Sequence, residues 1–242
     1  MTGAPPLDER LLAALAEDLG EAGDVTSNAV FPASHVASAV IVAKQDAVVC
    51  GGAVVERLFW LHDPGVNVVV LAADGARVMS GERVVELRGP TRSILAVERT
   101  ALNLLQRLSG IATQTRRFVD AAAGRAAICD TRKTTPLWRD LEKHAVTCGG
   151  GVNHRMGLHD MVMLKDTHAD GAGGIEAALR AVAPLRPRLK VAAEARDLDE
   201  VRAALAAGVD LLMLDNMPRA MVAEAAAMAC GTATTEITGG VT

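Results

Sequence analysis

Cationic side chains that could bind an anion are concentrated in two short segments of the chain. Residues 130–136 follow an apolar run and contain the adjacent Arg132 and Lys133, with hydroxyl side chains on both sides. Such a pair can present a bidentate guanidinium and a compact ammonium to a carboxylate or phosphate. In the second segment, three consecutive glycines precede Asn153, His154 and Arg155. We interpret these glycines as letting the backbone approach a ligand to which the following side chains donate hydrogen bonds.

Further charged residues follow apolar runs that we expect to be strands. Lys165 follows residues 162–164, and Glu194 and Asp215 follow two later runs. A single charge after a strand usually marks the start of a solvated loop. A series of charges is typical of parallel strands whose carboxyl ends converge, as on the active-site face of a β/α barrel. The five residues expected at that face are Asp130, Lys165, Glu194, Asp215 and Glu236.

This set of residues predicts the charge of the substrate. Several cations and two carboxylates in a chain of net charge -4 indicate a local anion site rather than a basic surface. A phosphorylated substrate together with Mg²⁺ suits such a site, because Mg²⁺ takes one or two carboxylates along with phosphate oxygens. The chain has none of the motifs GxSxG, GxGxxG or GxxxxGK[ST], so a covalent serine nucleophile and the common nucleotide-binding loops are not indicated.

The composition limits the class of protein. The 242 residues allow one large or two modest domains, and 50% of them are hydrophobic while only 2% are aromatic. The core must therefore consist of Ala, Val and Leu, which favours Ala-rich helices packed against Val-rich strands. The net charge of -4 argues against nucleic-acid binding.

The sequence also predicts the compartment. Its longest apolar runs, such as residues 68–73, are about six residues, far short of the roughly 20 that span a bilayer. Residues 1–20 carry acids and lack an apolar signal core, so we expect a cytoplasmic protein without membrane contact. The four cysteines form no CxxC pair, which favours buried thiols over a disulfide or a zinc site.

The N-terminal part alternates expected helices and strands. Helices are expected at Leu7–Leu19, 53–61 and 93–108, the last stopped by Ser109 and Gly110. Strands are expected at 37–43, 47–50, 66–71, 76–79 and 82–87. Turn dipeptides such as Asp74-Gly75 separate the last three as in hairpins, which predicts mostly antiparallel pairing.

A repeated strand-then-helix order follows and predicts a parallel sheet covered by helices. The expected strands are 126–129, 161–164, 189–193, 211–214 and 232–235, with a further short one near 152–154. The predicted fold class is thus an N-terminal open-faced α/β sandwich, residues 1–108, followed by a parallel β/α barrel, residues 109–242. Five or six strands are too few for a closed barrel of about eight, so we expect the barrel to be incomplete.

Several motifs in this order make the chain resemble the quinolinate phosphoribosyltransferase family, and the resemblance runs from Leu7 to the last residue. The motifs are ERTALN at 98–103, LSGIAT at 108–113, DTRKT at 130–134, GGGVNHR at 149–155, LKD at 164–166 and LDN at 214–216. Members of this family are pentosyltransferases of NAD biosynthesis. They join quinolinate to phosphoribosyl pyrophosphate with Mg²⁺ and release pyrophosphate and CO₂ to give nicotinate mononucleotide.

The resemblance implies a role for each matching residue. The carboxylates of quinolinate would be bound by Arg99, Arg132, His154, Arg155 and Lys165, with Arg99 contributed across a homodimer interface. Lys133 and Lys165 would face the phosphates, and Glu194 and Asp215 would hold the ribose hydroxyls and Mg²⁺, directly or through water. Thr238, Gly239 and Gly240 match the turn that receives the 5′-phosphate. Lys133, Lys165, Glu194 and Asp215 would be the catalytic residues.

The chain departs from the family pattern in a few places. Ala192, Thr167 and Leu137-Trp138 replace residues common in the family, but the charged roles stay filled. The printed sequence stops two residues after Gly240, where the family continues with a helix, a strand, a second phosphate loop and a tail. We therefore expect a shortened chain, whose activity needs its own measurement.

Three alternatives stay open. A related phosphoribosyltransferase-like protein, such as the molybdenum-associated relatives, would act on a different acid. A catalytically inactive homologue would serve as a binding or assembly subunit and release no CO₂. A lipoyl-type carrier is suggested by the turn pattern of residues 74–82, but no lysine lies between Gly75 and Gly81 to be modified.

Overall fold

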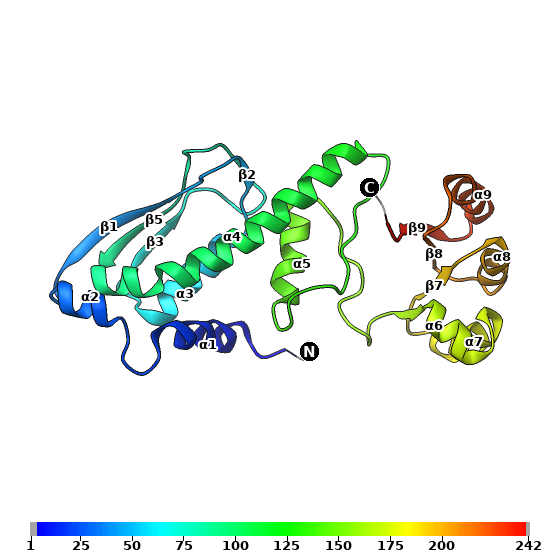
Figure 1. Cartoon of the computed structure of the whole chain (residues 1–242), viewed down its shortest axis with the longest axis horizontal. Helices are drawn as coiled ribbons and strands as arrows, with labels where there is room; N and C mark the ends of the chain where they lie inside the picture. The colour runs from blue at the N-terminus through cyan, green and yellow to red at the C-terminus, as the bar shows by residue number, and fades with distance from the viewer. Residues whose placement is uncertain (1–3, 241–242) are drawn as a thin grey trace. The chain divides into compact units, whose positions relative to one another are not determined.

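The structure, a computed structural model, describes residues 4–240 and contains two compact units, residues 1–154 and 155–242 (Figure 1). The expected division at residue 108 falls inside one continuous helix, α4 (Thr91–Ala122), and that domain boundary stays a prediction. No helix within residues 4–240 is both long and apolar enough to cross a membrane.

The first unit contains an antiparallel sheet with the strand order β1-β5-β3, formed by β1 (Val36–Val42), β5 (Arg83–Pro90) and β3 (Asn67–Val70). The short strands β2 (Ala47–Val48) and β4 (Arg77–Val78) form a separate antiparallel pair. The expectation of antiparallel strands is confirmed. Consecutive strands do not form hairpins, however, because β3 and β4 pair with β5 and β2 rather than with each other.

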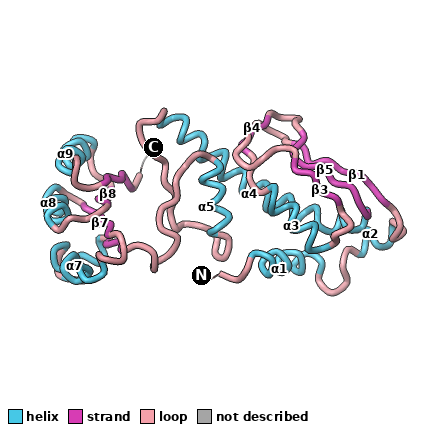
Figure 2. Tube along the Cα trace, turned by 180° about the vertical axis from the view of Figure 1, so that it is seen from behind, coloured by secondary structure: helices cyan, strands magenta, loops and turns pink. Residues whose placement is uncertain are grey.

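Helices α3 (Gly52–His62) and α4 cover one face of this sheet, as the view from behind also shows (Figure 2). Helices α1 (Leu7–Leu19) and α2 (Val25–Val30) pack against them. The prediction of α1 is confirmed at both ends. The apolar core contains Leu11, Leu58, Phe59, Val85 and Val97, each at most 1% exposed.

The prediction that Ser109 and Gly110 end the long helix is wrong, because α4 continues to Ala122. A glycine inside a helix costs only about 1 kcal/mol relative to alanine, and the buried Leu108 and Ala112 on either side gain more than that by packing. The Ser109 hydroxyl accepts a hydrogen bond from the Cys50 N–H (3.0 Å) and so ties this part of the helix to the turn between β2 and α3.

After α4, the expected strand at 126–129 is reduced to one parallel bridge between Cys129 and Val152. The N–H of Val152 donates to the carbonyl of Ile128 (2.8 Å), and the N–H of Asp130 donates to the carbonyl of Val152 (3.1 Å). Between these two segments lies α5 (Arg139–Cys148). The bridge brings the two cationic segments of the sequence side by side.

The second unit is a parallel sheet with the strand order β6-β7-β8-β9. Its strands are β6 (Val162–Leu164), β7 (Val191–Ala195), β8 (Leu211–Asp215) and β9 (Thr234–Thr238). They alternate with helices α6 (Asp166–Ala172), α7 (Ile175–Val182), α8 (Leu198–Ala206) and α9 (Arg219–Ala229), and a short 3-10 turn, η1 (Ala183–Leu185), follows α7. The predicted strand-helix alternation is confirmed, and with it the fold class.

Helices α7, α8 and α9 stack along one face of this sheet (Figure 2). The residues that point to them from β7 and β8 are Ala193, Ala195, Leu212 and Leu214, all fully buried. Alternate strand residues point to opposite faces. Glu194, between Ala193 and Ala195, and Asp215, directly after Leu214, therefore lie on the sheet face that these helices do not cover.

Candidate active site

In the first unit, one face of α5 holds residues 130–136, which we call the basic loop because it carries Arg132 and Lys133. Residues spaced by three and four share a helix face, and Arg139, Glu142 and Lys143 have this spacing. Arg139 donates from Nε to the Thr134 hydroxyl (2.9 Å). Glu142 accepts a hydrogen bond from the Thr135 N–H (3.1 Å). These side chains fix a segment that has no strand or helix of its own.

A buried ion pair between Lys143 and Asp130 joins the basic loop to the second cationic segment. The two side chains are 1% and 5% exposed. Asp130 also accepts from the His154 N–H (2.9 Å), and the Lys143 ammonium donates to the His154 carbonyl (2.9 Å). With its amide nitrogen turned toward Asp130, Asn153 adds another hydrogen bond of 2.6 Å. His154 and the basic loop therefore share one buried anchor.

Glu142 is ionised where it supports the basic loop. Burial by itself would raise its pKa, but the hydrogen bonds from Thr135 and Arg107 outweigh burial and leave the pKa below its usual value. Arg107 donates from Nε to Glu142 (2.7 Å) and from a terminal nitrogen to the Thr135 hydroxyl (2.6 Å). A carboxylate, rather than a neutral acid, thus organises this end of the loop.

The two cations of the basic loop differ in exposure. Arg132 is half-buried, and its Nε is buried with no hydrogen-bond partner within residues 4–240. Lys133 is exposed, and its backbone N–H donates to the Thr131 hydroxyl (3.0 Å). A buried donor without an acceptor costs about 1–3 kcal/mol. An anionic ligand on Arg132 would remove that cost.

The three glycines that we associated with ligand binding approach helix α4 instead. A Cβ atom on Gly149 would lie 2.5 Å from the Ala112 carbonyl oxygen, and one on Gly151 would lie 2.9 Å from the Thr115 side chain. Gly150 has φ of +87°, a conformation that favours glycine. The glycines therefore let the end of α5 pack tightly against α4, which fixes the segment that continues to His154.

Arg99 lies apart from this network on α4. It is exposed and makes no hydrogen bond or ion pair within the described part of the chain. Eight residues separate it from Arg107, which is about 12 Å along a helix. Among residues 4–154, therefore, no side chain occupies the Arg99 guanidinium.

In the second unit, the register of the sheet places Lys165 beside Glu194. Leu164 pairs with Ala193, so the next residue of each strand also meets its neighbour. The Lys165 ammonium lies 2.9 Å from the Glu194 carboxylate, and the two side chains are 44% and 10% exposed. The backbone N–H of Lys165 donates to His168 Nδ1 (3.0 Å). Arg155 also belongs to this unit and donates to the Met161 carbonyl (3.5 Å).

Asp215 is held by residues near the end of the chain. Its carboxylate accepts from the Thr238 hydroxyl (3.1 Å) and from the Asn216 amide (2.9 Å). Asn216, with φ of +51°, also accepts from the Gly240 N–H (3.0 Å). Gly239 has φ of +100°, and a Cβ there would lie 2.1 Å from the Asn216 side-chain oxygen. Only glycine fits this turn.

Three of the charges expected just after strands lie inside them instead. Glu194, Asp215 and Glu236 belong to β7, β8 and β9. These strands extend past their apolar runs because one face is free to carry polar side chains while the other stays against the helices. We call Lys165, Glu194, Asp215 and Thr238 the carboxyl-end face.

The donor atoms of this face suit Mg²⁺. Both carboxylates offer oxygen, the element that Mg²⁺ prefers. Asp215 is only half-buried, so it can share its oxygens with a hydrated ion. Glu194 already faces Lys165, so an ion there would compete with that ammonium or be bridged by water. The residues therefore fit one or two carboxylate contacts, with the remaining ligands supplied by water and substrate.

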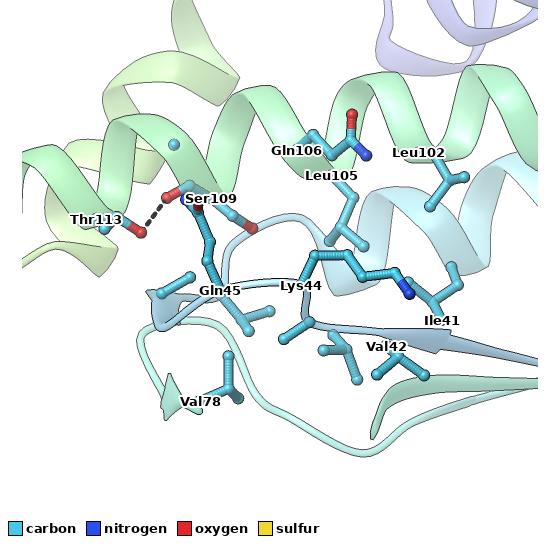
Figure 3. Close-up of a pocket in the computed structure, with 15 residues that line it drawn as sticks. Ile41, Val42, Lys44, Gln45, Val78, Leu102, Leu105, Gln106, Ser109 and Thr113 are labelled. Carbon is cyan, nitrogen blue, oxygen red and sulfur yellow. Dashed lines mark hydrogen bonds between the residues drawn. The ribbon is translucent and has the colours of Figure 1, made fainter. Parts of the chain in front are cut away.

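A separate cavity in the first unit does not fit an acidic substrate. It has a volume of about 350 Å³ and lies between the end of β1 and α4. Figure 3 shows Lys44 and Gln45 beside it, opposite Ser109 and Thr113 of α4, where the Thr113 hydroxyl donates to the Ser109 carbonyl (2.6 Å). Most of the other lining residues are apolar, and none of the predicted site residues is among them.

Sequence reasoning missed the residues that hold the site residues in place. Asp130 was expected on the active-site face of the barrel, but it lies in the first unit, paired with Lys143. Asn216 was noted only as part of a motif, and Lys143, Glu142 and Arg139 were not singled out. Three charged residues on one helix face usually indicate a solvated surface, so the sequence contained no signal that this face is buried against a loop. Asn216 could have been found from its place directly after a strand, next to Asp215.

Two family models match the chain. One, described as the N-terminal domain of quinolinate phosphoribosyl transferase, matches residues 24–109. The other, described as the C-terminal domain of the same protein, matches residues 111–242. Between them they include all the site residues described above.

Individual proteins are similar over most of the chain. A probable nicotinate-nucleotide pyrophosphorylase [carboxylating] of Bacillus subtilis is 42% identical over 93% of this chain and 78% of its own length. The chloroplastic nicotinate-nucleotide pyrophosphorylase [carboxylating] of Arabidopsis thaliana is 42% identical over 84% of this chain, which spans 61% of that longer protein. The crystal structure of NadC from Streptococcus pyogenes, 39% identical, superposes with a TM-score of 0.93 over 100% of this chain and 87% of that one.

Proposed function

Because the chain belongs to the quinolinate phosphoribosyl transferase family, we propose that it transfers the phosphoribosyl group of phosphoribosyl pyrophosphate to quinolinate. The products are nicotinate mononucleotide, pyrophosphate and CO₂, a step of NAD biosynthesis that we assign to the cytoplasm. The observation that carries this proposal is the carboxyl-end face, where a lysine, two carboxylates and a glycine turn meet on one side of a parallel sheet.

The family resemblance assigns the dicarboxylate to Arg132, His154, Arg155 and Lys165. Arg132 and His154 are held by the α5 network, and Arg155 and Lys165 come from the second unit. The buried, unpartnered Nε of Arg132 supports its assignment to a substrate carboxylate. We assign Arg99 to the site of the other subunit in a homodimer, which agrees with its exposed guanidinium.

The phosphorylated sugar would bind at the carboxyl-end face. Glu194 and Asp215 would hold the ribose hydroxyls, and Lys133 and Lys165 would face the phosphates. The turn at Thr238, Gly239 and Gly240 would receive the 5′-phosphate through backbone N–H groups. Mg²⁺ on Glu194 and Asp215, directly or through water, would neutralise charge on the leaving pyrophosphate.

Positioning and charge account for the chemistry. The bond from ribose C1 to pyrophosphate breaks with its electron pair on the leaving oxygen, and the pyridine nitrogen bonds to C1. Glu194 and Asp215 stabilise the cation-like sugar between these events. The carbon–carbon bond to the 2-carboxylate then breaks, CO₂ leaves, and the positive ring nitrogen stabilises the electron pair until a proton replaces the carboxylate. This reaction needs orientation and no protein nucleophile.

Replacing two lysines that flank strands of the same sheet tests this proposal. Lys165→Ala removes the cation at the carboxyl end of β6, and Lys190→Ala removes an exposed lysine just before β7. We expect CO₂ release from quinolinate, phosphoribosyl pyrophosphate and Mg²⁺ to fall about 100-fold or more in Lys165→Ala and to stay near wild type in Lys190→Ala. Lys133→Ala should behave as Lys165→Ala does, with the unfolding midpoint unchanged.

Nicotinate, which lacks the second carboxylate, serves as the control acid and should give little product. Wild-type chain that releases no CO₂ would support the inactive-homologue alternative. Equal loss in Lys165→Ala and Lys190→Ala, or normal turnover in Lys165→Ala, would overturn the site assignment.

A further inference from the structure

Four side chains with metal-binding chemistry meet in the first unit and take no part in the proposed reaction. They are Cys50, Asp74, His144 and Cys148, and their ligand atoms all lie within 4.8 Å of one another. They come from the turn between β2 and α3, the loop after β3, and the last turns of α5. Thiolates, imidazoles and carboxylates are all ligands that zinc takes in proteins.

Three of the six distances between these ligand atoms agree with a tetrahedron around one ion. With the usual zinc bond lengths, tetrahedral angles place a nitrogen and an oxygen ligand ~3.3 Å apart, and a sulfur ~3.6 Å from either of them. His144 Nε2 lies 3.1 Å from the Asp74 carboxylate. Cys148 Sγ lies 3.4 Å from the same nitrogen, and Cys50 Sγ lies 3.8 Å from Asp74 Oδ2. These three distances are within about 0.3 Å of their tetrahedral values, and all the ligand atoms lie within 4.8 Å of one another.

The surrounding structure holds each ligand in place. Asp74 Oδ1 accepts hydrogen bonds from the N–H groups of Gly51 and Gly52 (2.9 and 3.0 Å) at the start of α3, which leaves Oδ2 facing the cluster. The Cys50 backbone N–H and carbonyl both form hydrogen bonds with the Ser109 hydroxyl of α4. His144 and Cys148 are four residues apart on α5 and share one face of it. Carboxylates that bind a metal ion in proteins typically also accept hydrogen bonds from neighbouring groups, as Asp74 does here.

We propose that Cys50, Asp74, His144 and Cys148 bind one Zn²⁺ in a closed structural site with four protein ligands. Cys50 is fully buried, whereas the His144 side chain is 54% exposed, so the ion enters from the His144 side. Both thiols lose their protons to solvent as the ion binds. The set is too soft for Mg²⁺, which takes oxygen ligands and keeps its waters.

The position of this site on α5 gives the ion a structural consequence. His144 and Cys148 lie on the side of the helix away from Arg139, Glu142 and Lys143, by the 3.6-residue period. The metal would therefore connect one side of α5 to Cys50 and Asp74, while the other side of α5 holds the basic loop. Zn²⁺ would fix the helix from which that loop is positioned.

Metal binding by the intact chain tests the proposal directly. Chain purified without chelator, then dialysed, should hold about one zinc per chain by elemental analysis. Co²⁺ added to the chelator-treated chain should give the thiolate charge-transfer and tetrahedral absorption bands of a two-cysteine site. Added Zn²⁺ should raise the thermal unfolding midpoint of the wild type. Less than one-tenth of an equivalent of bound zinc and no thiolate–cobalt band would overturn the proposal.

Matched variants locate the site. His144→Gln and Cys148→Ser should each weaken Zn²⁺ binding at least tenfold and abolish the cobalt thiolate band or reduce it by half. The controls are His62→Gln, an exposed histidine of the same unit, and Cys230→Ser, an exposed cysteine of the second unit; both should bind as the wild type does. Since His144 is largely exposed, its replacement leaves the fold intact. Unchanged affinity in His144→Gln, or a Cys50–Cys148 disulfide in place of bound metal, would contradict the assignment.

Discussion

The basic loop and the carboxyl-end face both present charged side chains, but they are positioned by different means. On the carboxyl-end face, parallel pairing and strand alternation place Lys165, Glu194 and Asp215. In the basic loop the backbone is irregular, and buried side chains of α5 supply the order that a sheet would otherwise give. The difference teaches that a regular element carries a site through its backbone, whereas a loop needs a dedicated side-chain network.

The largest expected effect comes from breaking the buried ion pair under the loop. Lys143→Met leaves Asp130 buried and without its cation, which should lower the free energy of unfolding by about 3–5 kcal/mol. Denaturant unfolding measures this loss. Lys133→Ala, on the exposed side of the same loop, should change stability by less than about 0.5 kcal/mol. Equal losses in the two variants would show that the α5 network does not hold the loop.

A smaller effect is expected on the carboxyl-end face, where one glycine meets Asn216. Gly239→Ala places a Cβ into the Asn216 side chain at a φ of +100°, and such strain costs about 1–3 kcal/mol. The turn should shift, and the KM for phosphoribosyl pyrophosphate should rise. Gly231→Ala is the control, because it has a φ of +77° with nothing within 4 Å of the added carbon. A normal KM in Gly239→Ala would remove this turn from the phosphate site.

The smallest effect concerns how α5 is tied to α1. Asp140 accepts two hydrogen bonds from Arg10 (2.8 and 2.6 Å). These lower the pKa of Asp140, although partial burial opposes the change. A carboxyl group whose pKa is lowered on folding stabilises the fold above its unfolded pKa of about 3.9, and this contribution is lost as the pH falls through the folded value.

Asp140→Asn should therefore be less stable than the wild type by about 1 kcal/mol or less at neutral pH, because the pair is partly exposed. The difference should shrink as the pH falls below the unfolded pKa of about 3.9 and disappear once Asp140 is protonated in the folded state. Thermal unfolding at a series of pH values measures it. A difference that stays constant down to low pH would mean that the Asp140 charge contributes nothing.

Local patterns predicted much of the fold. Helix α1 is confirmed at both ends, since an apolar stripe and a following glycine are local signals. The end of α4 was predicted wrongly, because the gain from packing Leu108 and Ala112 is not visible in the local sequence. The strand expected at 126–129 became a single bridge for the same reason: pairing depends on a partner 23 residues away, at Val152.

The candidate site, like the fold, was predicted in part from the sequence. The sequence by itself determined which side chains could bind an anion, because charge and hydrogen-bonding capacity belong to the residue type. It also indicated Lys165, Glu194 and Asp215 as one group, because each follows an apolar run, although Glu194 and Asp215 lie inside their strands. It argued against zinc, because no two cysteines are close along the chain.

Only the tertiary structure decided which charged residues are buried and paired. Lys143 meets Asp130 at a separation of 13 residues. Cys50 and Asp74, from the loops after β2 and β3, meet His144 and Cys148 of α5. Such meetings depend on how helices pack, which is decided by apolar burial summed over many residues. No local pattern of charge contains that sum, so the side chains that support the basic loop and the grouping of Cys50, Asp74, His144 and Cys148 became visible only in the folded chain.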